Sequence, residues 1–367
     1  MEQWYRVNTR DIPSPALLVY PSRIEENVRR MISIAGGPEH LRPHVKTHKM
    51  SEVVSINQKF GISKFKCATV AEAEMVARCG GKDILLAMQP VGPNIQRFFS
   101  LQQAFPASRF SVLVDDASVA EQIAWIAITS GMITSVWIDI NNGMNRTGML
   151  PGEEALRLYA KITQTPFMTV RGLHVYDGHI HDSNITERMM TCEKDYEPVT
   201  ALIRNITDTQ GKAPMVVAGG TPTFPIHVNR KNTETSPGTC VLWDSGYEEQ
   251  YPDLDFLPAA VVLTRIVSKP GKNLLCLDLG HKAIAAEMPH PRVRLPDITV
   301  NRFVSHNEEH MVIESAEADH WKTGDVLYGI PWHICPTVPR YAFVYVIKNG
   351  EIAGEWQVDA RDRKITL

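Results

Sequence analysis

Short apolar runs of strand length alternate with longer amphipathic segments along the first two thirds of the chain. This alternation is typical of strand–helix units arranged around a parallel sheet. Eight such units within about 225 residues predict a (β/α)8 barrel, whereas an open doubly wound sheet usually needs fewer. The predicted strands are ALLVY (Ala16–Tyr20), a run that leads into RPHVKTHK (Arg42–Lys49), KFKCAT (Lys64–Thr69), DILLAM (Asp83–Met88), RFSVLV (Arg109–Val114), SVWIDI (Ser135–Ile140), FMTVRGLHV (Phe167–Val175) and PMVVAG (Pro214–Gly219).

The pattern changes after Cys240, where short β-rich runs are separated by turns and helical periodicity is weak. We therefore predict a barrel over residues 11–240 and a smaller C-terminal β domain over residues 241–367, with residues 1–10 packed against the β domain. The boundary is expected in the loop-rich stretch between Asn229 and Pro258. The β-rich runs are VVLTRIVSK (Val261–Lys269), NLLCLDLG (Asn273–Gly280), HMVIES (His310–Ser315), DVLYGIP (Asp325–Pro331) and YAFVYVIKNG (Tyr341–Gly350).

Composition excludes several classes of function. The chain has 367 residues, 44% hydrophobic and 22% charged, with a net charge of -3. Because basic and acidic residues are interspersed, we expect no nucleic-acid partner. The N-terminal residues carry charges where a secretion signal needs an apolar core, and no apolar run approaches the roughly 20 residues of a membrane span. Six cysteines without CxxC spacing favour reduced thiols. We therefore expect a cytoplasmic protein with a small-molecule partner.

Candidate chemistry lies where the predicted strands end. In a barrel of this kind, catalytic residues follow the strands and lie on the carboxyl-terminal face. Lys46, between His44 and His48, ends the second predicted strand. A buried lysine beside other nitrogen groups has a lowered pKa that suits Schiff-base formation. Each motif alone is more often a turn or a surface segment, but together they indicate one site. Three more polar clusters follow later strands: NRTG (Asn145–Gly148), YDGH (Tyr176–His179) and GGTPT (Gly219–Thr223).

The GGTPT segment has the composition of a phosphate-binding turn, because its glycines expose backbone N–H groups beside two hydroxyls. SPGT (Ser236–Thr239) offers a second glycine and further hydroxyls, so the two turns could grip one phosphate. Neither segment matches a P-loop or a GxGxxG fingerprint, which argues against nucleoside triphosphates and NAD. A reactive lysine and a phosphate site in a barrel indicate pyridoxal 5'-phosphate, which acts as an electron sink.

The motifs PHVKTHK, NRTG, YDGH, GGTPT, SPGT and PWHICPTV (Pro331–Val338), in this order, resemble those of a known family. It comprises the fold-type III pyridoxal phosphate enzymes related to D-threonine aldolase and eukaryotic-type D-serine dehydratase, within the alanine racemase superfamily. The resemblance extends from Pro13 to Val338. It implies that Lys46 is the Schiff-base lysine, that Arg146 lies near the phenolic oxygen of the cofactor and that Tyr176 lies near its ring. The other cofactor-binding residues that we predict are His44, Gly220, Thr221, Gly238 and Thr239.

His333 and Cys335 form the second candidate centre. They stand two residues apart, and an extended chain points such residues to the same side. HxC alone is a weak signal, because a buried cysteine beside a hydrogen-bonded histidine is more common. In the family that the chain resembles, this pair binds a divalent metal beside the cofactor, and open coordination positions mark a catalytic site. A thiolate and an imidazole favour zinc, whereas aldolases with a carboxylate in the second place use manganese, so both metals stay open.

The resemblance implies a lyase that acts on D-3-hydroxy amino acids, with two possible outcomes. If a base such as His179 removes the proton of the β-hydroxyl, the Cα–Cβ bond breaks and gives glycine and an aldehyde. If Lys46 removes the α-proton and the hydroxyl leaves, the products are a 2-oxo acid and ammonia, as in a D-serine dehydratase. The YDGH motif followed by His181 favours the aldolase, whereas the HxC pair is known among dehydratases. We favour the D-threonine aldolase-like reaction.

Two further alternatives are less well supported. Racemases of this superfamily need a second acid–base tyrosine from a partner subunit, and no such motif stands out. A single-barrel carrier of pyridoxal phosphate lacks a β domain and a metal pair, which this chain is predicted to have. The family implies a homodimer.

Overall fold

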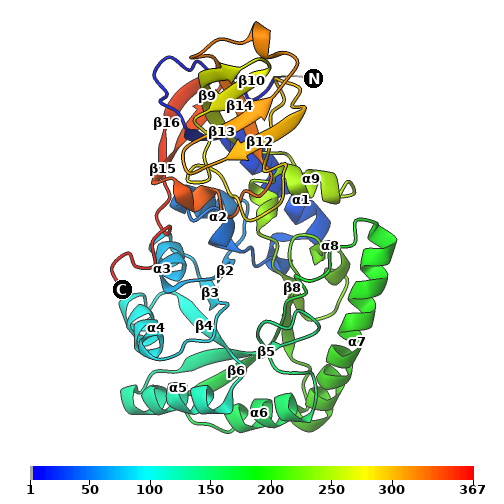
Figure 1. Cartoon of the computed structure of the whole chain (residues 1–367). Coiled ribbons are helices and arrows are strands. Elements are labelled where there is room, and N and C mark those ends of the chain that lie inside the picture. The colour runs from blue at the N-terminus through cyan, green and yellow to red at the C-terminus, as the bar shows by residue number, and fades with distance from the viewer. Residues whose placement is uncertain (1–2) are drawn as a thin grey trace. The chain divides into compact units, whose positions relative to one another are not determined.

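The computed structural model describes residues 3–367, which divide into two compact units (Figure 1). Each unit is formed by three separate segments of the chain. The first, named here the β unit, comprises the residues up to Arg29, Thr47–Val53 and Thr239–Arg361. The second, the barrel unit, comprises Arg30–Lys46, Val54–Gly238 and Asp362–Leu367.

Seven parallel strands form the sheet of the barrel unit, and each pairs with the next along the chain. Between the two edge strands lies the segment Leu41–His44, which bridges to Thr235 on one side and to Lys66 on the other. This segment closes the sheet, because Arg42 N donates to Thr235 O at 2.8 Å and Lys66 N donates to Pro43 O at 2.9 Å. The strands are β2 (Lys64–Cys67), β3 (Asp83–Leu86), β4 (Arg109–Val114), β5 (Thr134–Ile140), β6 (Met168–Val175), β7 (Met215–Ala218) and β8 (Thr233–Thr235).

Helices follow these strands and lie outside them (Figure 1). Three begin at a polar N-cap residue, Thr69, Asp116 or Asn184, whose side chain accepts hydrogen bonds from the first turn. Such a cap contributes about 1 kcal/mol. The helices are α3 (Val70–Arg78), α4 (Pro93–Ala104), α5 (Ala117–Ser130), α6 (Glu153–Thr163), α7 (Ile185–Gln210) and α8 (Phe224–His227), with the 3-10 turns η1 (Pro38–His40) and η2 (Val45–Thr47). Helices α1 (Pro21–Ala35) and α2 (Ser51–Lys59) run from the β unit into the barrel unit.

A network of buried charges lies at the amino ends of the barrel strands. Asp83 accepts hydrogen bonds from Arg42 and Arg109, each at 2.8 Å. Arg42 also donates to Glu234 at 2.8 Å. Arg42, Asp83 and Glu234 are all buried, and a buried charge is tolerated only when it is paired and hydrogen-bonded. The network therefore holds the amino ends of the strands together, away from the carboxyl ends where the motifs lie.

The sheet of the β unit has nine strands among the described residues, in the order β12-β13-β10-β9-β1-β15-β16, and β14 pairs with β9 and β11. Its pairs are antiparallel except β1 with β15. The strands are β1 (Ala16–Val19), β9 (Ala260–Gly271), β10 (Leu274–Leu277), β11 (Val293–Arg294), β12 (Arg302–His306), β13 (Met311–Glu314), β14 (Val326–Pro331), β15 (Phe343–Lys348) and β16 (Glu351–Gln357). The helical elements are α9 (Ser245–Gln250), η3 (Thr239–Val241), η4 (Ala318–His320) and η5 (Val338–Arg340).

The predicted fold class, a (β/α)8-type barrel followed by a smaller β domain, is confirmed, but the predicted set of barrel strands differs from the structure in three places. The run ALLVY forms β1, which pairs with β9 and β15 in the β unit and does not belong to the barrel. Strand β8 was not predicted, because the residues of TET are polar even though all three are buried. The run before Lys46 is the short bridging segment Leu41–His44. No helix in the described part of the chain is both long and apolar enough to cross a membrane.

Candidate active site

Lys46 lies in the turn η2, directly after the segment that closes the barrel. Its amine lies 5.8 Å from the ring centre of Tyr176, the first residue after β6. Arg146, in the loop after β5, places its guanidinium carbon 5.2 Å from the centre of the same ring. His44 is buried, and its Nδ1 accepts a hydrogen bond from Lys46 N at 3.3 Å. The structure thus brings together four residues that the sequence predicts around the cofactor.

A second lysine, which the sequence motifs do not single out, faces the same ring. Lys66 is buried, and its amine lies 5.2 Å from the ring centre of Tyr176. Burial and the charge of Lys46 lower the pKa of Lys66 to about 7. His174 Nδ1 lies 2.7 Å from Asp139 Oδ1, and the buried Nε2 has no hydrogen-bond partner among the described residues. Burial and the nearby charge of Lys66 lower the pKa of His174, so a neutral imidazole is available in the barrel interior.

The two predicted phosphate-binding turns lie next to each other. Gly238 N donates to Thr221 Oγ1 at 3.1 Å, which joins the SPGT turn to the GGTPT turn. Gly220 lies against Tyr176, since a Cβ at this position would come within 3.1 Å of the ring. Ser236 Oγ is buried and has no hydrogen-bond partner among the residues that the structure describes. An unsatisfied hydroxyl in a turn rich in small residues suits a phosphate oxygen.

A buried hydrogen-bond network supports the GGTPT turn. Asp177 Oδ1 accepts from Thr223 Oγ1 at 2.7 Å, and Asp177 Oδ2 lies 2.7 Å from His227 Nε2. Thr223 Oγ1 in turn accepts from Gly220 N at 3.1 Å. Asp177 directly follows Tyr176 in the chain, so one side chain of the YDGH motif lies near Lys46 and against Gly220 while the next fixes the glycine turn.

Asp177, Cys192 and His227 also place three metal-ligating atoms within 4.8 Å of one another. In the structure these groups are hydrogen-bonded, and Arg230 Nε donates to His227 Nδ1 at 3.1 Å. Burial and the charge of Asp177 raise the pKa of Cys192 to about 12. A protonated thiol and a neighbouring guanidinium disfavour a cation, because the thiolate is the metal ligand. We interpret this cluster as a support for the turn, and a metal there would require the thiol to lose its proton.

His179, the predicted base, is hydrogen-bonded on one side of its ring. Its Nε2 lies 2.8 Å from Asp195 Oδ2 on α7, and its buried Nδ1 has no hydrogen-bond partner among the described residues. A carboxylate on one nitrogen favours the proton there, so the other nitrogen keeps its lone pair. Gly143, at φ 131°, packs so closely that a Cβ would lie 2.5 Å from His179 Nε2. The structure thus holds the imidazole through Asp195, and the role of His179 as a base stays a prediction.

In the β unit, His333 and Cys335 follow β14. Cys335 Sγ lies 3.1 Å from Thr47 Oγ1 and 3.4 Å from Thr239 Oγ1. Thr239, which the resemblance assigns to the phosphate, thus has its hydroxyl beside the sulfur. In each of these contacts either the hydroxyl or the thiol can be the donor.

The imidazole of His333 is surrounded by groups that favour its charged form. Burial alone would lower the pKa of His333, but the hydrogen bond and charge of Cys335, together with Asp244 and Glu287, raise it to about 9. Its Nδ1 lies 2.5 Å from Glu287 Oε1. A divalent cation would find the same negative surroundings.

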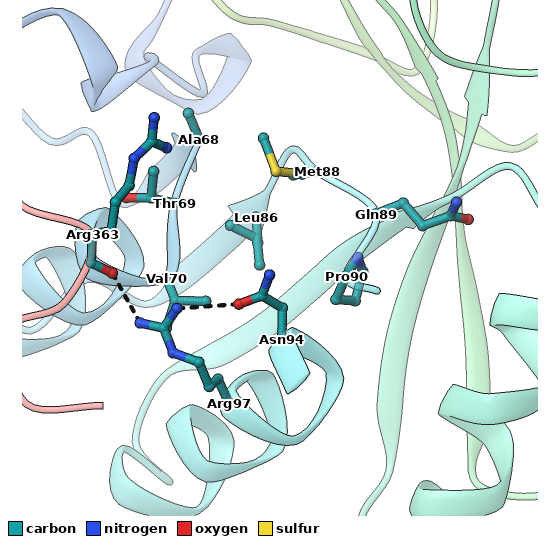
Figure 2. Close-up of a pocket in the computed structure, with 10 residues that line it drawn as sticks. All are labelled: Ala68, Thr69, Val70, Leu86, Met88, Gln89, Pro90, Asn94, Arg97 and Arg363. Carbon is teal, nitrogen blue, oxygen red and sulfur yellow. Dashed lines mark hydrogen bonds between the residues drawn. The ribbon is translucent and has the colours of Figure 1, made fainter. Parts of the chain in front are cut away.

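A separate pocket of about 210 Å³ opens at the ends of β2 and β3 (Figure 2). Its lining is half apolar and half polar, and several of the polar groups form hydrogen bonds within the protein. Arg97 donates to Arg363 O at 2.9 Å and to Asn94 Oδ1 at 3.1 Å, as the dashed lines in Figure 2 show. Gln89 Oε1 accepts from Asp115 N at 2.8 Å. None of the predicted site residues lines this pocket.

The residues fit both groups that the sequence predicts. Three cationic side chains around one aromatic ring suit a planar anion that carries a phosphate, and Ser236 offers a further donor. His333 and Cys335 offer nitrogen and sulfur, the donor atoms that zinc prefers. The roles of the individual residues stay predictions.

Several residues of the site were missed by sequence reasoning. Lys66 could have been found, because the alternation of KFKCAT places it on the opposite side of the strand from Phe65 and Cys67. Asp177 was part of a recognised motif, but its partner His227 was not. Asp195 and Glu287 lie in segments without any pattern, and only the folded chain brings them to His179 and His333.

The sequence matches two family models. The alanine racemase N-terminal domain matches residues 19–245, and a putative serine dehydratase domain matches residues 259–347. D-threonine aldolase of Arthrobacter sp is 26% identical over 357 residues, which cover 95% of this chain and 93% of that protein. The 3-hydroxy-D-aspartate aldolase of Paracoccus denitrificans (strain Pd 1222) is 25% identical over 367 residues, which cover 96% and 93%.

A solved structure has the same fold. The crystal structure of D-threonine aldolase from Filomicrobium marinum aligns with a TM-score of 0.86 at 24% identity and covers 97% of this chain and 98% of that one. The predicted resemblance and the predicted enzyme class, a pyridoxal phosphate-dependent lyase, are confirmed at the level of the family. The chain therefore belongs to the family of the alanine racemase N-terminal domain, and it groups with the aldolases and dehydratases of that family.

Proposed function

We propose that this protein is a pyridoxal phosphate- and divalent-metal-dependent lyase of D-3-hydroxy amino acids that cleaves them to glycine and an aldehyde, as a D-threonine aldolase does. The observation that carries the proposal is the contact between Thr47 Oγ1 and Cys335 Sγ at 3.1 Å. Because Thr47 is joined to Lys46 by a peptide bond, this contact ties the metal pair to the neighbour of the Schiff-base lysine.

In this proposal Lys46 binds the cofactor covalently. Arg146 and Tyr176 contact its ring system and His44 orients the Lys46 turn, while the phosphate is held at the two glycine turns. The cofactor supplies an electron sink for the bond that breaks. The small-residue turn at Gly220, the cations around Tyr176 and the unsatisfied Ser236 hydroxyl support this placement. The proposed phosphate ligands are Gly220, Thr221, Gly238 and Thr239. Gly220 N and Gly238 N donate to Thr223 Oγ1 and Thr221 Oγ1 in the structure, so they would exchange these hydrogen bonds for bonds to the phosphate.

His333 and Cys335 hold the proposed metal ion. A thiolate and an imidazole are the donor pair that favours zinc, and manganese is the alternative that harder donors would select. The hydroxyls of Thr47 and Thr239 lie within hydrogen-bond distance of this sulfur.

His179 is the proposed base of the aldol cleavage. In this proposal the imidazole takes the proton of the substrate's β-hydroxyl, and Asp195, which contacts Nε2 at 2.8 Å, holds the ring in place. The oxygen lone pair then forms the carbonyl of the aldehyde and the Cα–Cβ bond breaks, after which Cα gains a proton and glycine is released. A positioned base of this kind contributes typically about 10²–10⁴-fold to the rate.

A dehydratase is the second candidate, because the match to a putative serine dehydratase domain covers the segment that holds both His333 and Cys335. In that reaction Lys46 removes the α-proton and the β-hydroxyl leaves. The products are a 2-oxo acid and ammonia. A D-amino acid substrate, a homodimer and a cytoplasmic location accompany either reaction as predictions from the family.

Product analysis distinguishes these reactions. The purified protein, supplied with pyridoxal phosphate and Zn²⁺ or Mn²⁺, is incubated with D-threonine, D-serine and, as a stereochemical control, L-threonine. Glycine and acetaldehyde from D-threonine support the aldolase, and pyruvate and ammonia from D-serine support the dehydratase. Conversion of a D-amino acid to its L form without cleavage would indicate a racemase. Bound cofactor without any turnover would contradict a lyase and favour a carrier.

A further inference from the structure

We propose that Glu287 is a positioning residue for the metal site, and that it fixes which ring nitrogen of His333 faces the metal ion. The inference rests on the proposed metal role of His333 and Cys335. It starts from the hydrogen bond between His333 Nδ1 and Glu287 Oε1, whose atoms lie 2.5 Å apart. Glu287 forms no ion pair with a lysine or arginine in the described part of the chain, so the imidazole is its charged partner.

The hydrogen bond determines the tautomer of the histidine. A bound metal ion would displace one proton of the imidazole, and the carboxylate at Nδ1 would keep the remaining proton on that nitrogen, so that Nε2 binds the ion. A carboxylate on the far side of a ligating imidazole also fixes the plane of the ring and makes the ligand more basic. In this proposal Glu287 supports the ligand and does not bind the ion itself, because its carboxylate is engaged by His333 Nδ1.

The loop that carries Glu287 is tied to the metal-binding segment by a second link. The buried hydroxyl of Thr337 donates to His333 O at 2.8 Å and accepts from Ala285 N at 3.1 Å. Ala285 precedes Glu287 by two residues. The Thr337 hydroxyl therefore connects the backbone of His333 to the backbone segment that carries Glu287. The two links together keep Glu287 and His333 next to each other.

The backbone between the two proposed ligands is also restrained. Ile334 N, between His333 and Cys335, donates to the buried Asp244 Oδ2 at 3.0 Å. Asp244 Oδ1 accepts from Tyr247 N at 2.9 Å at the start of α9. The main chain of the pair is fixed in this way, so the His333 side chain can still rotate about its own torsions. The hydrogen bond to Glu287 restrains that rotation.

Cobalt binding tests the proposal without relying on activity. The full-length protein, holding its pyridoxal phosphate, is stripped of metal with a chelator and titrated with Co²⁺, whose absorption reports thiolate and imidazole coordination. We compare the unchanged protein with E287A, E287Q and E287D, and with E355A as a control for an exposed glutamate on β16. Thermal unfolding of each metal-free variant shows that it is folded.

We expect E287A to weaken Co²⁺ binding about 10–100-fold, the usual effect of removing such a group, with an unchanged thiolate-to-cobalt band. E287D should recover part of the affinity, E287Q should lie between E287A and the unchanged protein, and E355A should bind normally. Equal affinity in E287A would overturn the proposal, and so would a change in the cobalt spectrum that shows the loss of an oxygen ligand. H333A and C335S separate this failure from failure of the proposed function, since normal cobalt binding in both variants would remove the metal site itself.

Discussion

The hydroxyl oxygen of Thr47 lies 3.1 Å from the sulfur of Cys335. Thr239 places a second hydroxyl 3.4 Å from the same sulfur. Two hydroxyl groups around one sulfur can both donate to a thiolate, which is the form that binds a metal. Because Thr47 follows Lys46 in the chain, a change at the sulfur acts next to the proposed Schiff-base lysine.

Replacing Cys335 by aspartate should change the preferred metal. A carboxylate is a harder ligand than a thiolate, so C335D should lose affinity for Zn²⁺ and gain activity with Mn²⁺ relative to Zn²⁺. The measurement is the ratio of D-threonine cleavage with each metal after chelator treatment and reconstitution. C276S, at a partly buried cysteine in β10, serves as the matched control. An unchanged ratio in C335D would show that Cys335 is not a ligand.

Replacing His179 should separate the two candidate reactions. H179Q removes the proposed base for the β-hydroxyl, so kcat for aldol cleavage should fall about 10²–10⁴-fold with little change in KM. D195N, which removes the carboxylate partner of Nε2, should cause a smaller fall in kcat. Steady-state kinetics with D-threonine give both values, and H310Q at an exposed site in the β unit is the control. Unimpaired cleavage by H179Q would exclude His179 as the base.

Replacing Lys66 by methionine should stabilise the cofactor-free protein in a pH-dependent way. The pKa of Lys66 in the folded chain is about 7, below the ordinary value of about 10.4. Below pH 7 the amine is charged in both states, and its burial then costs the folded state most. As the pH rises toward 10, the folded amine is neutral while the unfolded one still binds a proton, so the cost disappears.

Urea unfolding at several pH values measures this effect. At pH 6 the free energy of unfolding of K66M should exceed that of the unchanged protein by up to a few kcal/mol, since each pKa unit corresponds to about 1.4 kcal/mol. The difference should shrink toward zero near pH 10. K348M, at an exposed lysine of β15, should show little difference at any pH. A pH-independent difference for K66M would mean that Lys66 is not a buried amine.

Replacing Asp83 by asparagine should destabilise the barrel unit. The change leaves Arg42 buried with one partner fewer, and breaking such a pair costs about 3–5 kcal/mol. Burial would raise the pKa of Asp83, but Arg42, Arg171 and Arg109 outweigh it and hold that pKa well below its usual value. The stabilisation is therefore full above pH 4 and is lost as the pH falls further.

Denaturant unfolding of D83N at pH 7 and at pH 3 should show a smaller difference from the unchanged protein at the lower pH. D208N, at an exposed aspartate of α7, is the control. A D83N variant that is as stable as the unchanged protein at pH 7 would contradict the role of the network.

The sequence predicts the barrel class well, because most of its strands are apolar runs followed by amphipathic helices. It fails at β1 and β8 for different physical reasons. All four residues of β1 are buried, and a continuous apolar run indicates burial on both sides without indicating which sheet the strand joins. Strand β8 is polar because Glu234 pairs with Arg42 and Lys64 inside the protein.

The site was predictable only in part for a related reason. Lys46, Arg146 and Tyr176 lie in recognisable motifs, and the structure brings them together. Glu287 and Asp195 act through a partner far away in the chain, 46 and 16 residues distant, and neither lies in a motif. A supporting contact of this kind depends on tertiary structure, which a local pattern does not contain.

The most direct test of the account is to locate the covalently bound cofactor. The protein is purified with pyridoxal phosphate, reduced with borohydride to fix the imine as a stable amine, digested and analysed by mass spectrometry. The account predicts the added mass on the peptide that contains Lys46, and none on that peptide in K46A. A modified Lys66, whose amine lies slightly closer to the Tyr176 ring, or no modified lysine at all, would contradict it.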